Sequence, residues 1–184
     1  MIVSPTSLDG PALIDTVRRG DERGWFARVM CRETLAAHGL PHDFVQANHS
    51  MTRRRGSIRG LHFQRPPHAE AKLVRCVRGA IHDVIVDVRE GSPTRWRWEA
   101  FALSAENGRM LIVPEGFAHG FQTLTDDAEV TYHVTHSYTP EAEGGLRHSD
   151  PALGIAWPLP VTDISAKDRA WPLLAAPAIA AFGA

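Results

Sequence analysis

Hydrophobic and polar residues alternate along most of the chain in short runs, with a period of two residues. This period is typical of strands that bury one face. Turn-forming residues such as Arg55-Gly56, Arg78-Gly79 and Glu106-Asn107-Gly108 separate the runs. Many short strands punctuated in this way predict an all-β sandwich or barrel. The expected strands are Ala12–Val17, Trp25–Met30, Phe44–Thr52, Ser57–Gln64, Ala71–Val77, Ala80–Val88, Arg97–Leu103, Met110–Val113, Phe117–Leu124 and Glu129–His136.

Helical patterns are sparse. Arg32–His38 is followed by Gly39, a common helix stop, and Ser165–Leu174 begins with a residue type that caps helix N-termini. No repeat, linker or compositional shift divides the 184 residues, so we expect one domain over residues 1–184. The alanine-rich end, Ala175 to Ala184, is interpreted as a packed or frayed tail.

Composition narrows the class of protein. Hydrophobic residues make up 43% and charged residues 22% of the chain, which is typical of globular rather than disordered proteins. The formal net charge of -1 gives no footprint for nucleic acid or an anionic membrane surface. The basic cluster Arg53-Arg54-Arg55 precedes Gly56 and is interpreted as a solvated turn. No apolar stretch approaches the ~20 residues of a membrane span.

The N-terminus has no basic region followed by an apolar run, so we expect no signal peptide. The two cysteines, Cys31 and Cys76, are far apart and form no CxxC motif. Both features favour a protein of the reducing cytoplasm.

Strand faces indicate where chemistry could lie. Alternation places Arg59 and His62 on opposite faces of their strand, but a bulge at Gly60 would bring them together, since glycine inside a strand often marks one. Lys72 and Tyr132 each share a strand face with apolar neighbours. Burying an ammonium without a partner is costly, so Lys72 either extends to the barrel mouth or has a function.

Two histidines stand out among ten. His62 and His119 are flanked by glycines and aromatic residues inside strand-like segments. One interpretation is a metal site, because Pro114-x-Gly116-x-x-His119 matches a cupin motif and His62, His68, Glu70 and His119 are possible ligands. Metal cupins usually take two ligands from a His-x-His pair, which this chain lacks.

The other interpretation is proton transfer at a carbon next to a ketone. This chemistry needs a base that works near neutral pH, a stabiliser for the enolate and an acid on the opposite face. Histidine suits the first role, lysine or protonated histidine the second, and tyrosine the third. His62, Lys72, His119 and Tyr132 supply every role without a metal or cofactor.

Eight motifs stand out for their order and spacing. They are Arg59-Gly60-Leu61-His62-Phe63-Gln64, Ala71-Lys72-Leu73-Val74-Arg75, Val86-Asp87-Val88-Arg89, Gly91-Ser92-Pro93-Thr94, Leu103-Ser104-Ala105-Glu106-Asn107, Pro114-Glu115-Gly116-Phe117-Ala118-His119-Gly120-Phe121, Asp150-Pro151 with Leu153-Gly154-Ile155 and Trp157-Pro158, and Ile164-Ser165-Ala166-Lys167-Asp168. Together they resemble the dTDP-4-dehydrorhamnose 3,5-epimerase family, and the resemblance extends from about Asp21 to Asp168.

The resemblance implies an all-β, cupin-type jelly-roll β-barrel with a few short peripheral helices, assembled as a homodimer without metal or cofactor. It implies epimerisation of a dTDP-4-keto-6-deoxy-hexose at C3 and C5, as in rhamnose-type deoxysugar biosynthesis. His62 would be the base, oriented by Asp168, and Tyr132 the acid, while Lys72 and His119 would hold the 4-keto oxygen. The positions that would bind the substrate are Arg23, Phe26, Arg28, Gln46, Asn48, Arg59, Tyr138, Glu143 and Lys167.

Several positions depart from the family pattern. Arg28 stands where glutamate is common, and Ala47 replaces an aspartate. His136-Ser137 replaces Asp-Tyr, and His148-Ser149 replaces Trp-Asp. Because the residues of the chemistry are intact, we expect a working epimerase. Its nucleotide, its 4-keto sugar or the number of carbons it epimerises would differ. A non-catalytic sugar-nucleotide binder is disfavoured, since it needs neither acid nor base.

Overall fold

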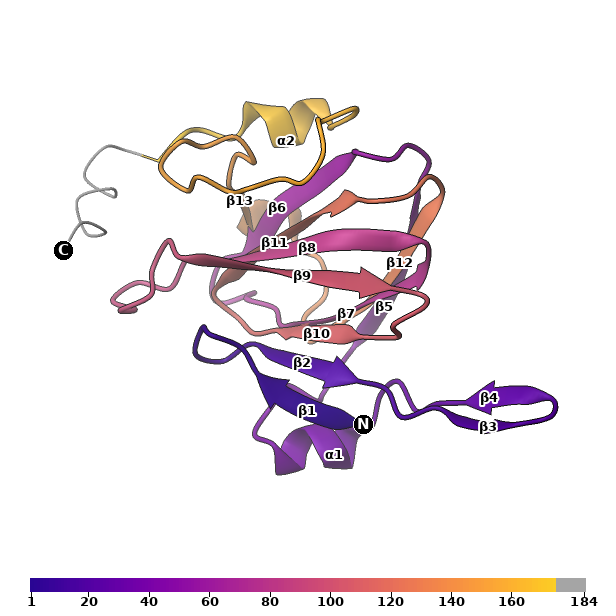
Figure 1. The fold of residues 1–184 in the computed structure, drawn as a ribbon. Helices are drawn as coiled ribbons and strands as arrows, with labels where there is room; N and C mark the ends of the chain where they lie inside the picture. The colour runs from indigo at the N-terminus through magenta and orange to yellow at the C-terminus, as the bar shows by residue number, and fades with distance from the viewer. Residues whose placement is uncertain (175–184) are drawn as a thin grey trace.

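Two antiparallel β-sheets face each other in the computed structural model, which describes residues 1–174 (Figure 1). The tail from Ala175 to Ala184 lies outside the described residues. In spatial order, the first sheet contains β1 (Ile2–Pro5), β2 (Ala12–Asp15), β10 (Met110–Val113), β7 (Lys72–Arg78), β12 (Ala128–Val134) and β5 (Gln46–Thr52). The second contains β13 (Glu143–Gly145), β6 (Ile58–Gln64), β11 (Phe117–Thr123), β8 (Ala80–Asp87) and β9 (Trp98–Ser104).

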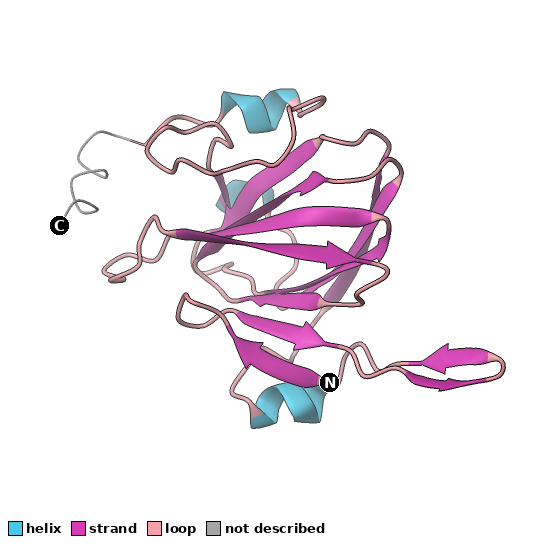
Figure 2. Cartoon of the chain, in the orientation of Figure 1, coloured by secondary structure: helices cyan, strands magenta, loops and turns pink. Residues whose placement is uncertain are grey.

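The remaining elements lie at the periphery (Figure 2). They are a hairpin of β3 (Arg19–Asp21) and β4 (Gly24–Phe26), a 3-10 turn over Pro140–Ala142, and the helices α1 (Arg32–Ala37) and α2 (Ala166–Ala170). None of the helices among residues 1–174 is long and apolar enough to cross a bilayer.

The sequence predictions hold for the long strands and for the short strands β2 and β10, but fail for other short strands. The expected strand Trp25–Met30 is wrong beyond Phe26, because only Gly24–Phe26 pairs, with β3. The strands β1, β3 and β13 were not expected; β13 consists of Glu143-Gly144-Gly145, which has little intrinsic strand preference. Both helices form where expected, but α2 ends at Ala170, two residues before Pro172, rather than at Leu174.

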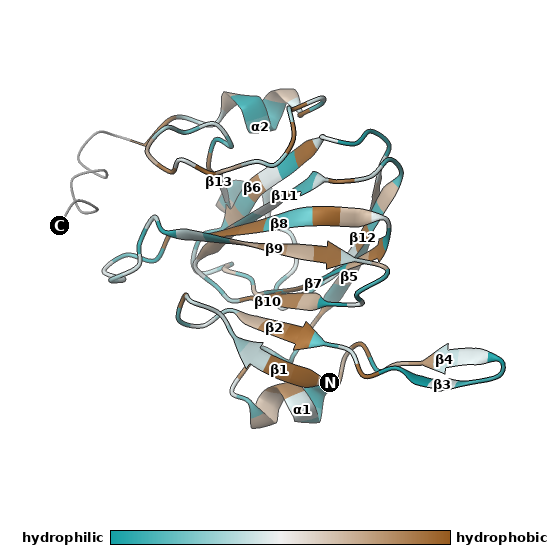
Figure 3. Ribbon diagram, in the orientation of Figure 1, coloured by the Kyte–Doolittle hydropathy of each residue, from teal (hydrophilic) through white to brown (hydrophobic). Residues whose placement is uncertain are grey.

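Three apolar clusters stabilise the layers. Between the sheets, Val74 and Val130 of the first sheet pack with Ile81, Ile85 and Phe117 of the second. On the outer face of the first sheet, α1 contributes Leu35. On the outer face of the second sheet, the segment after β13 packs its apolar side chains on β8 and β11. Brown and teal positions alternate along several strands in Figure 3, as a half-buried sheet requires.

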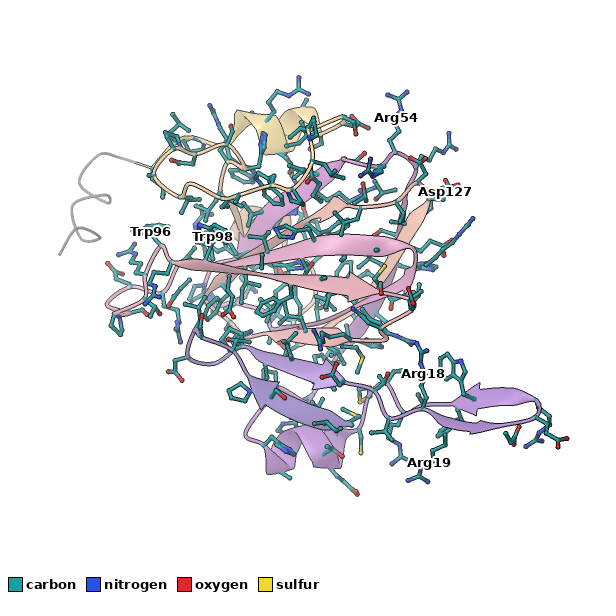
Figure 4. The ribbon with its side chains drawn as sticks, viewed as in Figure 1. Arg18, Arg19, Arg54, Trp96, Trp98 and Asp127 are labelled. Atoms are coloured by element: carbon teal, nitrogen blue, oxygen red, sulfur yellow. The ribbon has the colours of Figure 1, made fainter. Side chains whose placement is uncertain are left out.

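The C-terminal segment is fastened to the second sheet. Trp98 donates a hydrogen bond from Nε1 to the carbonyl of Leu153 at 2.8 Å, and Trp96 packs in the same cluster (Figure 4). An isolated bridge pairs Ile58 with Ile164. Ser165 caps α2 by accepting a hydrogen bond from the backbone N–H of Asp168. These contacts fix α2 beside the start of β6.

The expected bulge at Gly60 is confirmed. His62 pairs with His119 and Arg59 with Phe121, so three steps along β6 match two along β11. Gly60 has φ +104°, and a Cβ there would lie 2.6 Å from the carbonyl oxygen of His119. The two strands therefore touch through backbone where any side chain would intervene.

The β3–β4 hairpin projects from the body of the two sheets (Figure 1). Arg18 and Arg19 lie at its base (Figure 4). Its tip is polar, while Trp25 and Phe26 are 53% and 65% exposed. Two adjacent exposed aromatic residues on a projecting hairpin are typical of a surface that another molecule covers.

The close approach at Gly60 gives a stability prediction. We expect Gly60→Ala to lower the free energy of unfolding by roughly 3 kcal/mol, because the methyl group overlaps β11 backbone. Gly91→Ala is the matched control: its φ is also positive, at +75°, but nothing lies within 4 Å of the added Cβ. We expect it to cost about 1 kcal/mol. Urea unfolding of both variants checks this, and equal losses would contradict it.

Candidate active site

A cavity of about 640 Å³ opens between the two sheets beside α2. All five residues predicted to act in the chemistry line it, namely His62, Lys72, His119, Tyr132 and Asp168. They come from both sheets and from the C-terminal helix: His62 and His119 from β6 and β11, Lys72 and Tyr132 from β7 and β12. The expected convergence of these side chains is therefore present.

His62 is held by a buried carboxylate. Its Nε2 donates a hydrogen bond to Oδ1 of Asp168 at 2.5 Å, and the Gly60 backbone N–H donates to the other oxygen at 3.2 Å. Because the Asp168 partner fixes the proton on Nε2, Nδ1 is the nitrogen left to accept a proton. This is the arrangement of a base oriented by a carboxylate.

Asp168 is 4% exposed. Burial alone would raise the pKa of Asp168, but the hydrogen bond and charge of His62, with the donors from Gly60 and Ser165, outweigh it. The net effect holds its pKa below the ordinary value, so the carboxylate stays charged beside His62.

His119 has its own carboxylate. Its Nε2 donates to Oδ1 of Asp83 at 2.8 Å, and Asp83 is fully buried on β8. The second oxygen of Asp83 has no partner among the described residues. The carboxylate orients the ring of His119 toward the cavity.

Lys72 also lines the cavity and is 7% exposed. It donates a hydrogen bond to the carboxylate of Glu70, whose side chain is 10% exposed. A buried ammonium is thus paired, as its desolvation requires. The alternative in which Lys72 extends to the barrel mouth is wrong, because its ammonium is buried beside Glu70.

Tyr132 reaches the cavity from β12, in the sheet opposite His62. Burial raises the pKa of the Tyr132 hydroxyl, and the negative charge of Glu70 raises it further, against a smaller effect of Arg59. The hydroxyl therefore keeps its proton at neutral pH, as an acid must before it donates.

Arg59 lies on the same cavity wall as His62 because of the bulge at Gly60. Its Nε donates to Oγ1 of Thr52 at 2.7 Å and its Nη2 to the carbonyl of Met51 at 3.1 Å. These bonds direct an exposed guanidinium to the mouth, where it can meet an anionic group.

Four other predicted binding residues form a chain of contacts at the rim. Lys167, which lines the cavity, donates to Glu143 at 2.7 Å, and the Tyr138 hydroxyl donates to Glu143 at 3.2 Å. The backbone N–H of Tyr138 donates to the Gln46 side chain at 3.4 Å. Asn48 follows on the same face of β5 as Ser50, which lines the cavity.

Of the nine predicted binding residues, Arg59 and Lys167 line the cavity, four more lie at or near its rim, and three lie away from both. Arg23 is exposed at the hairpin tip and pairs with Asp21 at 2.6 Å. Phe26 and Arg28 line a separate hollow of about 140 Å³ with Arg19. The structure therefore does not bring the hairpin to the site of its own chain.

The departures from the family pattern also lie outside the cavity lining. Ala47 is exposed on β5, and Ser137 accepts a hydrogen bond from Gln64 through its carbonyl. His148 packs under the C-terminal segment, where burial first, and then Arg147 and Arg169, lower its pKa. The effect of these departures on the nucleotide therefore stays a prediction.

The alternative of a metal site required His62, His68, Glu70 and His119 to converge. Each has a different partner instead: Asp168, His136, Lys72 and Asp83, in that order. Within the described residues, no group of three or more histidine, cysteine or acidic side chains is arranged to hold a metal ion.

Asp83 was missed from the sequence, and Glu70 was considered only as a metal ligand. A signal for Asp83 exists: it is an acidic residue on the inward face of β8, between Ile81 and Ile85. A lone carboxylate in such a run needs a partner, but only the paired strand β11 supplies it.

One cavity thus holds two histidines, a lysine and a tyrosine, and each of the first three is bonded to its own carboxylate. This set of side chains, built on two antiparallel sheets, is typical of an enzyme that transfers protons by acid–base chemistry. Residues 5–176 match the family model described as dTDP-4-dehydrorhamnose 3,5-epimerase. The chain is 46% identical over 176 residues to the dTDP-4-dehydrorhamnose 3,5-epimerase of Salmonella typhimurium, covering 95% of this chain and 96% of that protein.

Two solved structures are similar throughout. The crystal structure of dTDP-4-dehydrorhamnose 3,5-epimerase from Bacillus anthracis with TDP and PPi bound has a TM-score of 0.91 at 43% identity, over 94% of this chain and 99% of that one. The dTDP-6-deoxy-D-glucose-3,5-epimerase of Legionella pneumophila, in complex with dTDP-4-keto-L-rhamnose, has 0.88 at 39%, over 94% and 92%.

The chain therefore belongs to the dTDP-4-dehydrorhamnose 3,5-epimerase family and is an isomerase. The predicted fold class, an all-β cupin-type jelly roll with few short helices, is confirmed.

The lowered pKa of Asp168 gives a pH prediction. A carboxyl whose folded pKa lies below its unfolded value of about 3.9 contributes stability that is present above that pH and lost as pH falls through the folded value. We expect Asp168→Asn to unfold about 2 kcal/mol more easily than the parent at pH 7. The gap should shrink below about pH 4.

Urea unfolding at neutral and acid pH measures this gap. Asp163→Asn, which removes a nearby exposed carboxylate of the same wall, should show no comparable gap at either pH. A gap for Asp168→Asn that is independent of pH would contradict the assignment.

Proposed function

We propose that this chain epimerises a dTDP-linked 4-keto-6-deoxy-hexose at C3 and C5 by metal-free proton transfer, in rhamnose-type deoxysugar biosynthesis. The observation that carries the proposal is the placement of His62 and Tyr132 on opposing sheets around one cavity, with Lys72 and His119 also lining it. The ligands named for the Bacillus and Legionella relatives support the choice of a dTDP-sugar.

Proton transfer in this cavity follows from the chemistry of a 4-keto sugar. Nδ1 of His62 removes the proton from the carbon beside the ketone, and Asp168 stabilises the imidazolium that results. The electron pair moves onto the 4-keto oxygen, where the Lys72 ammonium and His119 stabilise the enolate. Tyr132 then protonates the same carbon from the other face, which inverts it. The Tyr132 phenolate then takes up a proton from solvent and the His62 imidazolium releases one, so both groups return to their starting forms.

The mouth of the cavity has the charge that a nucleoside diphosphate needs. Arg59 and Lys167 are cationic groups of the lining, and Tyr138 offers an exposed aromatic ring beyond them. We assign the diphosphate to the arginine side and the base to the tyrosine. Free thiols at Cys31 and Cys76 suit a reducing compartment, so we place the reaction in the cytoplasm.

The exchange of substrate protons with solvent tests the function. In D₂O, the parent chain should introduce deuterium at C3 and C5 of dTDP-4-keto-6-deoxyglucose, located by NMR. His62→Ala and Tyr132→Phe should each slow this by about 100-fold or more, because base or acid is lost.

The matching CDP-, GDP- and UDP-linked sugars are the control for the nucleotide. Parent-like exchange in both variants would contradict the roles of His62 and Tyr132. Exchange at one carbon, or with another nucleotide only, would replace the proposed substrate or regiochemistry.

We also propose that the enzyme is a homodimer in which each hairpin completes the site of the partner. Arg23 and Phe26 fall at substrate-contact positions of the family resemblance, yet they project away from their own cavity, and Trp25 and Phe26 expose apolar rings. A second copy of the chain supplies both a cover for these rings and a hairpin for this cavity.

Subunit mixing tests the exchange of hairpins. Arg23→Ala and His62→Ala should each be nearly inactive alone. Mixed and allowed to exchange, they should regain about a quarter of parent activity, since half of the dimers are mixed and each has one intact site. Mixed dimers that form but stay inactive would contradict the exchange.

A further inference from the structure

Glu70 is a buried carboxylate at the cavity to which the proposed reaction gives no role. It precedes β7 and accepts a hydrogen bond from Lys72, two residues further on. Its side chain is 10% exposed and that of Lys72 8%. Hence the pair is nearly as buried as the core.

Contacts with Gln64 fix the position of the Glu70 side chain. The amide of Gln64 faces its second oxygen at 3.5 Å. Gln64 is itself immobilised, because it donates to the carbonyl of His68 at 2.9 Å and accepts from the backbone N–H of Thr139 at 2.6 Å. Because these contacts hold the carboxylate in place, the carboxylate sets the position of the Lys72 ammonium bonded to it.

Tyr132 is within the field of the same carboxylate. In the β7–β12 pairing, Tyr132 lies opposite Val74 and Val134 opposite Lys72, so Tyr132 and Lys72 are diagonal neighbours. Both line the cavity, which places the ammonium, its carboxylate and the phenol in one corner. Burial raises the pKa of Tyr132, and the negative charge of Glu70 raises it further.

We propose that Glu70 is a positioning residue: its fixed carboxylate holds the Lys72 ammonium at the cavity wall, in the corner that Lys72 shares with Tyr132. The inference rests on the proposed function, in which Lys72 stabilises the enolate and Tyr132 is the acid. Glu70 touches neither the substrate nor the reacting carbons and acts through these two side chains.

Two physical effects support this role. The hydrogen bond from Lys72 to a fixed carboxylate holds the ammonium in one position at the cavity wall, where the enolate forms. The negative charge of Glu70 also disfavours the phenolate of Tyr132, which could donate no proton, so it extends the donating form of Tyr132 to higher pH.

The other charged groups around the cavity differ from Glu70 in sign or in their position relative to Tyr132. From the strands packed against β12, β7 brings Lys72, while β5 brings only Ser50 and Thr52 to the lining. The charged or titratable groups across the cavity are Arg59, His62, His119, Asp163, Lys167 and Asp168. Asp168 is bonded to His62, so Glu70 is the carboxylate on the Tyr132 side.

The pH dependence of Glu70→Gln tests the role. The amide keeps the shape but removes the charge, so the alkaline limb of kcat for solvent exchange should move to lower pH by about one unit. At neutral pH we expect kcat to fall about 10-fold or more, with KM nearly unchanged, because the loss is in the transition state. A fall in kcat without movement of the limb overturns the proposal.

Tyrosine titration gives a readout that needs no activity. The chain has only two tyrosines, Tyr132 and Tyr138, so ¹³C-labelled tyrosine gives two resonances that Tyr132→Phe assigns. Glu70→Gln should lower the pKa of Tyr132 and leave that of Tyr138 in place, which also shows that the variant folds. An unmoved Tyr132 resonance overturns the proposal.

Glu129→Gln is the matched control, since it removes one carboxylate from the strand of Tyr132 at a position bonded to His49 and Arg78. This variant should change neither the alkaline limb of kcat nor the pKa of Tyr132. An effect equal to that of Glu70→Gln would overturn the specific role of Glu70. If the parent exchanges no proton of any 4-keto sugar, the proposed function fails instead, while the titration still decides the charge effect of Glu70.

Discussion

The site depends on the backbone contact between β6 and β11 at Gly60. There the bulge turns Arg59 and His62 toward the same cavity, and His119 faces His62 across the pair. The N–H of Gly60 also donates to Asp168, which ties the C-terminal helix to the strand that carries the base. One backbone irregularity thus sets the positions of four functional side chains, because a side chain at residue 60 would push the strands apart.

A second constraint is electrostatic. Three of the side chains proposed for the chemistry are each bonded to a buried carboxylate: His62 to Asp168, His119 to Asp83 and Lys72 to Glu70. These carboxylates fix the orientation of the groups that line the cavity. Since burying such pairs gains little stability by itself, their repeated use indicates selection for orientation and charge.

Sequence alone predicted much of this. The alternation of apolar and polar residues predicted the long strands and placed Lys72 and Tyr132 on apolar faces. This works because the residues on the buried face of a strand recur at every second position. It could not find β13, whose Gly144 and Gly145 carry no strand signal and pair only because β6 lies beside them. It missed the pairing of His119 with Asp83, because contacts across a sheet depend on register.

The residues proposed for proton transfer and those predicted for substrate recognition lie on different elements. The acid–base residues come from strands whose faces are buried, so each is fixed by core packing and tolerates little change. Arg23, Phe26 and Arg28 belong instead to an exposed hairpin and the turn after it, where substitution disturbs no core cluster. In the proposed dimer, Arg28, which stands where the family pattern has glutamate, would change the charge offered to the substrate of the partner without moving His62 or Tyr132. In this arrangement a family can keep one proton-transfer site and change its sugar nucleotide, because the two properties are built on elements of different rigidity.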